Sequence, residues 1–78
     1  MAVEDTVKEI LNQVLDVKPE EIMPDDKLED GLGVDSTEMV EISVGLKKAL
    51  GVEISDNELK KSHSFNEIVT ILKSKGAN

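Results

Sequence analysis

Apolar residues recur at intervals of three and four in three separate stretches of this chain. Such spacing places the apolar side chains along one side of a helix. It predicts one helix from residue 4 to residue 15 or 16, another over residues 36–50, and a last one that starts at residue 65 and ends before Gly76. Because the strand-like run at residues 52–54 is too short to build a sheet, the chain is predicted to be all-α.

Helix-start signals predict one further, short helix. A Ser or Asp followed three residues later by Glu caps a helix N-terminus, because the two side chains accept hydrogen bonds from free backbone N–H groups. This pattern occurs at residues 55–58 and 64–67, and Asp35 with Glu38 forms a close relative of it. We expect a short third helix over residues 56–61. Gly51 should end the preceding helix in the left-handed conformation.

A long loop is expected between the first and second helices. Residues 17–34 contain both prolines of the chain and lack helical periodicity,. Ile22, Leu28 and Leu32 offer apolar anchors, so we expect an ordered loop packed on the core, with a short turn over residues 19–22. The predicted order is four helices, with the long loop between helices one and two and a short third helix. A chain of this length forms a single domain, here residues 1–78,.

Charge and composition exclude several classes of function. Seventeen acidic and nine basic residues give a net charge of −8, which repels nucleic acid and attracts basic protein surfaces,. No apolar run of about 18 residues is present to span a membrane, and the N-terminus lacks a secretion signal, so we expect a cytoplasmic protein. Residues 26–37 are superficially similar to a calcium loop. Leu28 and Thr37 occupy positions that need oxygen ligands, so no metal site is predicted.

Ser36 is the residue best placed for covalent chemistry, because the chain has no cysteine and a single histidine. It stands where the long loop meets the second helix, and the positive end of a helix favours a phosphate esterified to its hydroxyl. Asp and Ser at a helix start also serve as ordinary caps, which leaves a purely structural role open. Ser36 is not expected to be a hydrolytic nucleophile, because His63 has no recognisable arrangement with it.

The second helix carries apolar residues on two faces. The core stripe consists of Met39, Ile42, Leu46 and Leu50,. Val40 and Val44 lie more than a quarter turn away, beside charged residues, which suits a docking surface for another protein. Two ordinary alternatives are that these valines are scattered surface residues or that they pack under the long loop.

Over essentially its full length, the chain resembles acyl carrier proteins. The resemblance rests on Gly33-Val34-Asp35-Ser36 after a long loop, on the helix that follows, and on Gly51-Val52-Glu53-Ile54-Ser55-Asp56. It implies a four-helix bundle whose aliphatic interior admits an acyl chain. It also implies that a phosphopantetheinyl transferase moves 4'-phosphopantetheine from coenzyme A to Ser36, and that the thiol of this arm carries acyl groups as thioesters.

The resemblance implies roles for further residues. Asp35 matches the motif aspartate next to the modified serine. The partner-binding face would comprise Thr37, Glu38, Val40, Glu41, Val44 and Lys48. The acyl cavity would be lined by Leu46, Ile54 and Leu59. The expected partners are acyl-loading, elongating or acyl-transferring enzymes, and the carrier itself would not be an enzyme. The second face of the helix is too small and charged to demand a permanent partner, so we expect a monomer.

Three departures from the family pattern set this chain apart. Thr37 replaces the leucine that commonly follows the serine. Lys47 and Lys48 stand where carriers of bulk fatty acid synthesis are commonly acidic, which weakens attraction to basic enzyme patches at that end of the helix. We therefore hypothesise a specialised carrier for a dedicated lipid, lipopolysaccharide or polyketide pathway. Two alternatives stay open: an arm loaded with aminoacyl or peptidyl groups, and an unmodified helical interaction module in which Ser36 is only a cap.

Overall fold

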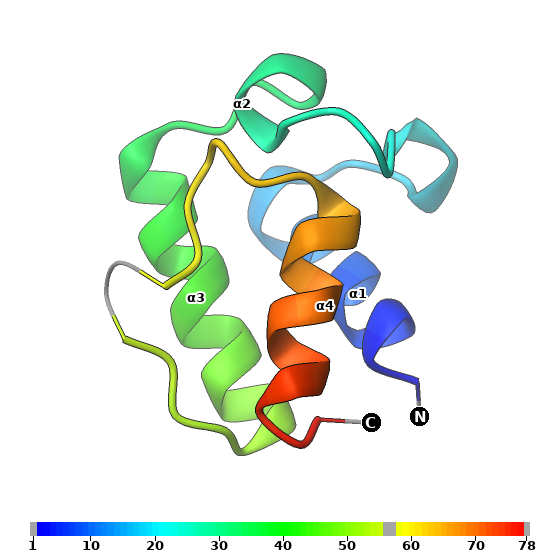
Figure 1. Ribbon diagram of the computed structural model, residues 1–78. Helices are drawn as coiled ribbons and strands as arrows, with labels where there is room; N and C mark the ends of the chain where they lie inside the picture. The colour runs from blue at the N-terminus through cyan, green and yellow to red at the C-terminus, as the bar shows by residue number, and fades with distance from the viewer. Residues whose placement is uncertain (1, 56–57, 78) are drawn as a thin grey trace.

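The computed structural model describes residues 2–55 and 58–77, and in these ranges the regular structure is helical (Figure 1). The α-helices are α1 (Val3–Leu15), α2 (Leu28–Gly31), α3 (Ser36–Leu50) and α4 (Phe65–Ser74), and a 3-10 turn, η1 (Pro19–Glu21), follows α1. The predictions of an all-α fold, of the three long helices and of a turn after Lys18 are confirmed. None of the described helices has the length and apolar character that crossing a bilayer requires.

One aliphatic core holds α1, α3 and α4 together. Helix α1 contacts both α3 and α4, and Figure 1 shows it behind them, with the two chain ends on the same side of the molecule. The buried apolar residues are Val3, Val7, Ile10, Leu11, Ile22, Leu28, Val34, Met39, Ile42, Leu46, Ile54, Leu59, Phe65, Ile68, Val69 and Leu72. Gly45 allows a close approach of α1, because a Cβ there would lie 3.1 Å from Ile10 Cγ2. Burial of aliphatic surface is therefore the main stabilising contribution.

The predicted caps form at the starts of α3 and α4. At α3, Glu38 N–H donates to Asp35 Oδ1 over 2.8 Å, and Asp35 N–H donates to Glu38 Oε1 over 3.1 Å. Ser64 and Glu67 make the same reciprocal pair at the start of α4. Gly51 ends α3 with φ of 66°, in the left-handed region that glycine adopts without strain,.

The prediction of a short third helix over residues 56–61 is wrong for its described part, residues 58–61. Residues 58–61 form turns and a bend with no helix, and residues 56–57 lie outside the described residues. Ser55 N–H does donate to Glu58 Oε1 over 2.9 Å, as the sequence pattern predicts. The helix does not follow, because Lys60 N–H donates to the His63 imidazole Nδ1 over 3.0 Å and His63 N–H donates back to Lys60 O. These bonds close a turn.

The short helix occurs instead inside the predicted loop, as α2. Its first amides have no local side-chain cap. Leu28 N–H donates to His63 O and Glu29 N–H to Lys61 O, each over 3.0 Å. Lys27 and Ser64 form an isolated antiparallel bridge alongside. A segment more than thirty positions away therefore accepts the hydrogen bonds of the first amides of α2,. The residues next to α2 in sequence give no signal that predicts this helix.

We expect Ile42→Val to lower the free energy of unfolding by about 1 kcal/mol, because it removes one methylene from a side chain with no solvent exposure,. Urea unfolding followed by circular dichroism measures the change. Val40→Ala is the control, because Val40 lies on the same helix and is 61% exposed; it should change stability by less than about 0.5 kcal/mol. Equal effects of the two substitutions would contradict the assignment of the core face of α3.

Candidate functional site

Ser36 occupies the first position of α3, directly after the capping residue. The Asp35 carboxylate supplies the side-chain cap and the Glu38 carboxylate completes it, so the sequence-based alternative in which Ser36 caps the helix is not what the structure shows. The Ser36 residue is exposed, and its hydroxyl has no hydrogen-bond partner among the described residues. A cap of this kind contributes about 1 kcal/mol, and here it leaves the serine oxygen free.

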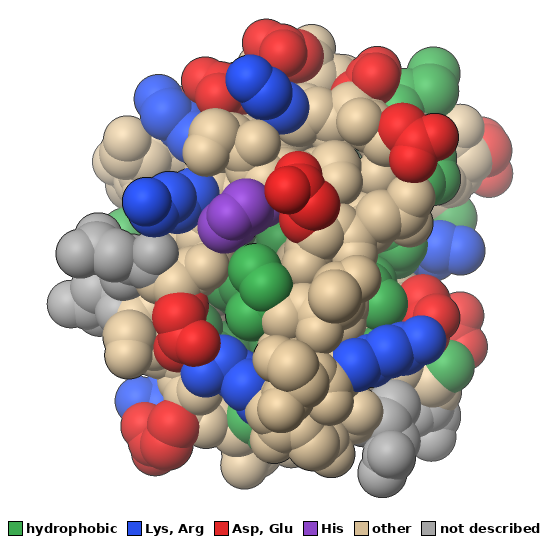
Figure 2. All heavy atoms as spheres, viewed as in Figure 1, with side chains coloured by type: hydrophobic (Ala, Val, Ile, Leu, Met, Phe, Trp, Pro, Cys, Tyr) green, Lys and Arg blue, Asp and Glu red, His purple; other side chains and the backbone are tan. Residues whose placement is uncertain are grey.

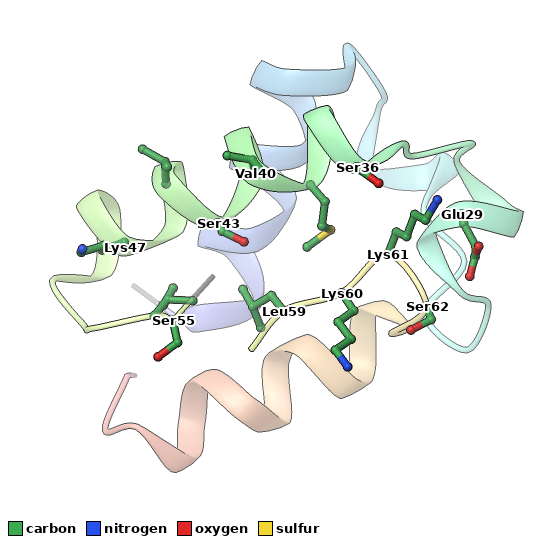
Figure 3. A pocket seen from close by; sticks show the side chains of 13 residues that line it. Glu29, Ser36, Val40, Ser43, Lys47, Ser55, Leu59, Lys60, Lys61 and Ser62 are labelled. Carbon is green, nitrogen blue, oxygen red and sulfur yellow. The ribbon is translucent and has the colours of Figure 1, made fainter. Parts of the chain in front are cut away.

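A groove of about 650 Å³ begins at Ser36 and runs between α3 and the segment that precedes α4. Figure 3 shows α3 along one side and Ser55 with residues 59–62 along the other. The α3 side is lined by Ser36, Met39, Val40, Ser43, Val44 and Lys47. The opposite side is lined by Ile54, Ser55, Leu59, Lys60, Lys61 and Ser62, and Glu29 of α2 closes the end near Ser36. The groove therefore combines an apolar lining with serine hydroxyls and lysine side chains.

Charges are distributed unevenly around the groove. Figure 2 shows many of the acidic side chains over α2 and η1, and a basic and an acidic side chain on either side of the single histidine. Lys47 at the far end of the groove pairs with Glu53, with 3.6 Å between Nζ and Oε2. Lys60 and Lys61 have no salt bridge or side-chain hydrogen bond within the described ranges.

The segment that lines the groove opposite α3, here called the groove wall, is bonded to Lys75 and to α2. Glu58 accepts hydrogen bonds from Lys75, just beyond α4, and from Ser55 N–H. These bonds lower the pKa of the Glu58 carboxyl below its ordinary value of 4.5, with the Lys75 bond the larger cause and the backbone N–H the second. At the other end, Lys61 O accepts from Glu29 N–H. The wall is thus positioned from both ends.

The arrangement suits attachment of a group to Ser36 better than hydrolysis at Ser36. Hydrolysis needs a base within hydrogen-bond reach of the serine oxygen. His63 does not line the groove, and its Nδ1 already accepts from Lys60 N–H. By contrast, the Ser36 and Thr37 amides at the start of α3 make no hydrogen bond among the residues described, and such amides favour an anion esterified nearby.

The predicted site residues separate into three groups. Ile54 and Leu59 line the groove beside Ser36. Leu46 is fully buried and does not line it, so its role in an acyl cavity stays a prediction. The residues predicted to bind partners all lie on α3: Thr37, Glu38, Val40, Glu41, Val44 and Lys48. Sequence reasoning missed Glu29, Lys60, Lys61 and Ser62, because their place in the groove depends on the pairing of α2 with a distant segment.

Comparison with known proteins shows which family this sequence matches. The chain matches the family described as phosphopantetheine attachment site over residues 5–72. An acyl carrier protein of Wolinella succinogenes is 35% identical over 69 residues, which cover 88% of this chain and 91% of that protein. One of Campylobacter hominis is 32% identical over 78 residues, covering 100% and 99%. One of Solidesulfovibrio magneticus is 33% identical over 75 residues, covering 96% of each chain.

The chain belongs to the acyl carrier protein family. It is an acyl carrier that bears a covalently attached 4'-phosphopantetheine group. The described residues fit that group: an exposed serine hydroxyl at a helix N-terminus, free amides beside it, and an open groove leading away from it. The family resemblance inferred from the sequence is confirmed.

In this acyl carrier, Glu58→Gln should make stability less sensitive to acid. The folded-state pKa of Glu58 is lowered, so its stabilising contribution is present above the unfolded pKa and is lost as the pH falls through the folded pKa. Wild type should therefore lose stability more steeply than Glu58→Gln as the pH falls below 4.5.

Urea unfolding at a series of pH values measures this slope. Glu41→Gln is the matched control, because Glu41 is exposed and makes no hydrogen bond or salt bridge to any described residue. Parallel pH curves for wild type and Glu58→Gln would contradict the proposed coupling of the groove wall to Lys75.

Proposed function

We propose that Ser36 is the residue that carries 4'-phosphopantetheine, and that the protein presents acyl groups to the enzymes of fatty acid, lipid or polyketide biosynthesis without being an enzyme itself. The observation that carries the proposal is the free, exposed Ser36 hydroxyl at the mouth of the groove. In the transferase reaction the serine oxygen would bond to the phosphorus of coenzyme A, lose its proton, and displace the adenosine bisphosphate half of that molecule.

The residues of this chain orient the modification in two ways. Asp35 and Glu38 hold the first turn of α3, so the Ser36 oxygen has a defined position. The positive end of α3 favours the negative charge of a phosphodiester at Ser36. When attached, the arm supplies a thiol that holds acyl groups as thioesters. No base is needed on this chain, because the transferase would supply one.

The groove is the proposed site for the acyl chain. Five of its lining residues are apolar: Met39, Val40, Val44, Ile54 and Leu59. An acyl chain laid against them leaves water, which is favourable in proportion to the apolar area removed from solvent. Ile54 and Leu59 are buried already, so they can form a floor without large rearrangement. Leu46 would contribute only if the acyl chain penetrates beyond the groove into the core.

The exposed face of α3 is the proposed surface for partner enzymes. Val40 is 61% exposed and Val44 is 46% exposed, and Thr37, Glu41 and Lys48 are also exposed along the helix. The Glu38 carboxylate is already engaged in the cap, which leaves Glu41 as the freer carboxylate of this face. Partners would include a phosphopantetheinyl transferase and acyl-loading, elongating or acyl-transferring enzymes. We further propose that the carrier is monomeric and works in the cytoplasm, where coenzyme A and these enzymes can reach Ser36.

Incubation with coenzyme A, magnesium and a promiscuous phosphopantetheinyl transferase should add the mass of a single phosphopantetheine group. Ser36→Ala should gain no mass, because it lacks the acceptor oxygen. Intact-mass spectrometry measures the addition. Ser43→Ala is the matched control: Ser43 lines the same groove from the same helix, and its loss should leave modification complete. Modification of Ser36→Ala would contradict the proposal.

Lys48→Glu tests the hypothesis of a specialised carrier. The substitution restores acidity at the end of α3, so it should raise turnover with enzymes of bulk fatty acid synthesis by up to about fivefold, the equivalent of one exposed ion pair. Lys18→Glu makes the same charge change at an exposed position outside α3 and should have little effect. If wild type already matches a housekeeping carrier with these enzymes, the hypothesis of a dedicated pathway is wrong.

A further inference from the structure

We propose that Lys61 is a positioning residue that binds the phosphodiester at Ser36 and so directs the arm into the groove. The inference rests on the proposed attachment at Ser36 and extends it by naming the side chain that decides where the arm lies. It is carried by three observations: the way in which the Lys61 backbone is held, the position of its ammonium group, and the absence of a competing partner among the described residues.

The backbone of Lys61 is fixed at the mouth of the groove. Its carbonyl accepts from Glu29 N–H over 3.0 Å, and the His63 carbonyl accepts from Leu28 N–H over the same distance. The turn is closed by the two hydrogen bonds between Lys60 and His63. Because α2 immediately precedes the short connection to Ser36, these bonds tie Lys61 to the same end of the molecule as the serine. The position does not depend on the lysine side chain.

The Lys61 side chain extends toward the end of the groove at which Ser36 and Glu29 lie. Figure 3 shows its ammonium group between the Ser36 hydroxyl and the Glu29 carboxylate, and all three residues line the groove. Lys61 is half-buried, so less of its conformational freedom remains to be lost than for a fully exposed lysine. Its ammonium makes no salt bridge within the described part of the chain, Glu29 included. A cation is therefore available where the phosphodiester would carry its negative charge.

The other lysines of the groove differ from Lys61 in ways that make them controls. Lys60 is exposed, and Figure 3 shows its side chain pointing away from Ser36. Lys47 lies at the far end of the groove and is paired with Glu53. Charge alone would make Lys60 and Lys61 equivalent, because they are neighbours in sequence. The two side chains differ in the direction in which they point.

Binding of the phosphodiester by Lys61 would change the equilibrium between an arm that lies in the groove and an arm that extends into solvent. The arm leaves Ser36 at the groove mouth, and the groove leads from there past Val40 and Leu59. An ion pair at the first atoms of the arm restricts the directions in which the rest can extend. Since an exposed ion pair is a weak interaction, the expected shift in this equilibrium is about two- to fivefold.

The test compares wild type, Lys61→Gln, Lys61→Arg and Lys60→Gln, each loaded with phosphopantetheine and without acyl cargo. Phosphorus-31 NMR reports the surroundings of the phosphodiester, and the rate at which the arm thiol reacts with a neutral disulfide reports how often the arm leaves the groove. Intact mass and amide NMR spectra establish that each protein is loaded and folded. Neither readout depends on enzymatic activity.

Lys61→Gln should shift the phosphorus resonance and raise the thiol reaction rate about two- to fivefold, whereas Lys61→Arg should retain the wild-type behaviour. Lys60→Gln should match wild type. The same change in Lys61→Gln and Lys60→Gln, or no change in either, would overturn the role of Lys61. Failure of wild type to load at all would overturn the attachment at Ser36 and with it this inference, so the two failures are distinguishable.

Discussion

The pair of hydrogen bonds between Asp35 and Glu38 is the interaction on which the site depends. Together these side chains satisfy backbone donors at the start of α3, and Asp35 takes the capping role that Ser36 could also have performed. The consequence is chemical: Ser36, at the first position of α3, keeps a side-chain oxygen that no other described group uses. The packing of α1 against both α3 and α4 in the aliphatic core then holds α3 in place,.

The groove follows from a second constraint, the pairing of α2 with the segment before α4. Carbonyl oxygens of Lys61 and His63 replace the local cap that α2 lacks. This pairing brings Lys61 and Ser62 to the mouth of the groove, opposite α3, while the Glu58–Lys75 interaction holds the same segment from its other side. Attachment, acyl binding and partner docking can thus share α3, with the Ser36 oxygen at its start and with Val40 and Val44 both lining the groove and exposed to partners.

Local sequence patterns were sufficient to predict the long helices but not to predict the groove. The spacing of apolar residues and the capping pairs predicted α1, α3 and α4, because both signals act within a few positions. The helix expected at residues 56–61 was wrong over its described part, because the Lys60 amide bonds to the His63 side chain and closes a turn. Helix α2 and the lining role of Lys61 could not be predicted, since both depend on bonds between segments far apart in sequence. Ser36 was found because the motif and the helix start coincide.

The arm on Ser36 is proposed to place its acyl chain in the groove between α3 and the opposite side, which is formed by Ile54, Ser55 and residues 59–62. The most direct measurement is a set of nuclear Overhauser effects between a carbon-13-labelled acyl chain on the loaded protein and its side chains. We expect contacts from the acyl methylenes to Met39, Ile54 and Leu59. An acyl chain that shows no contact with these residues, or contacts a different face of the protein, would contradict it.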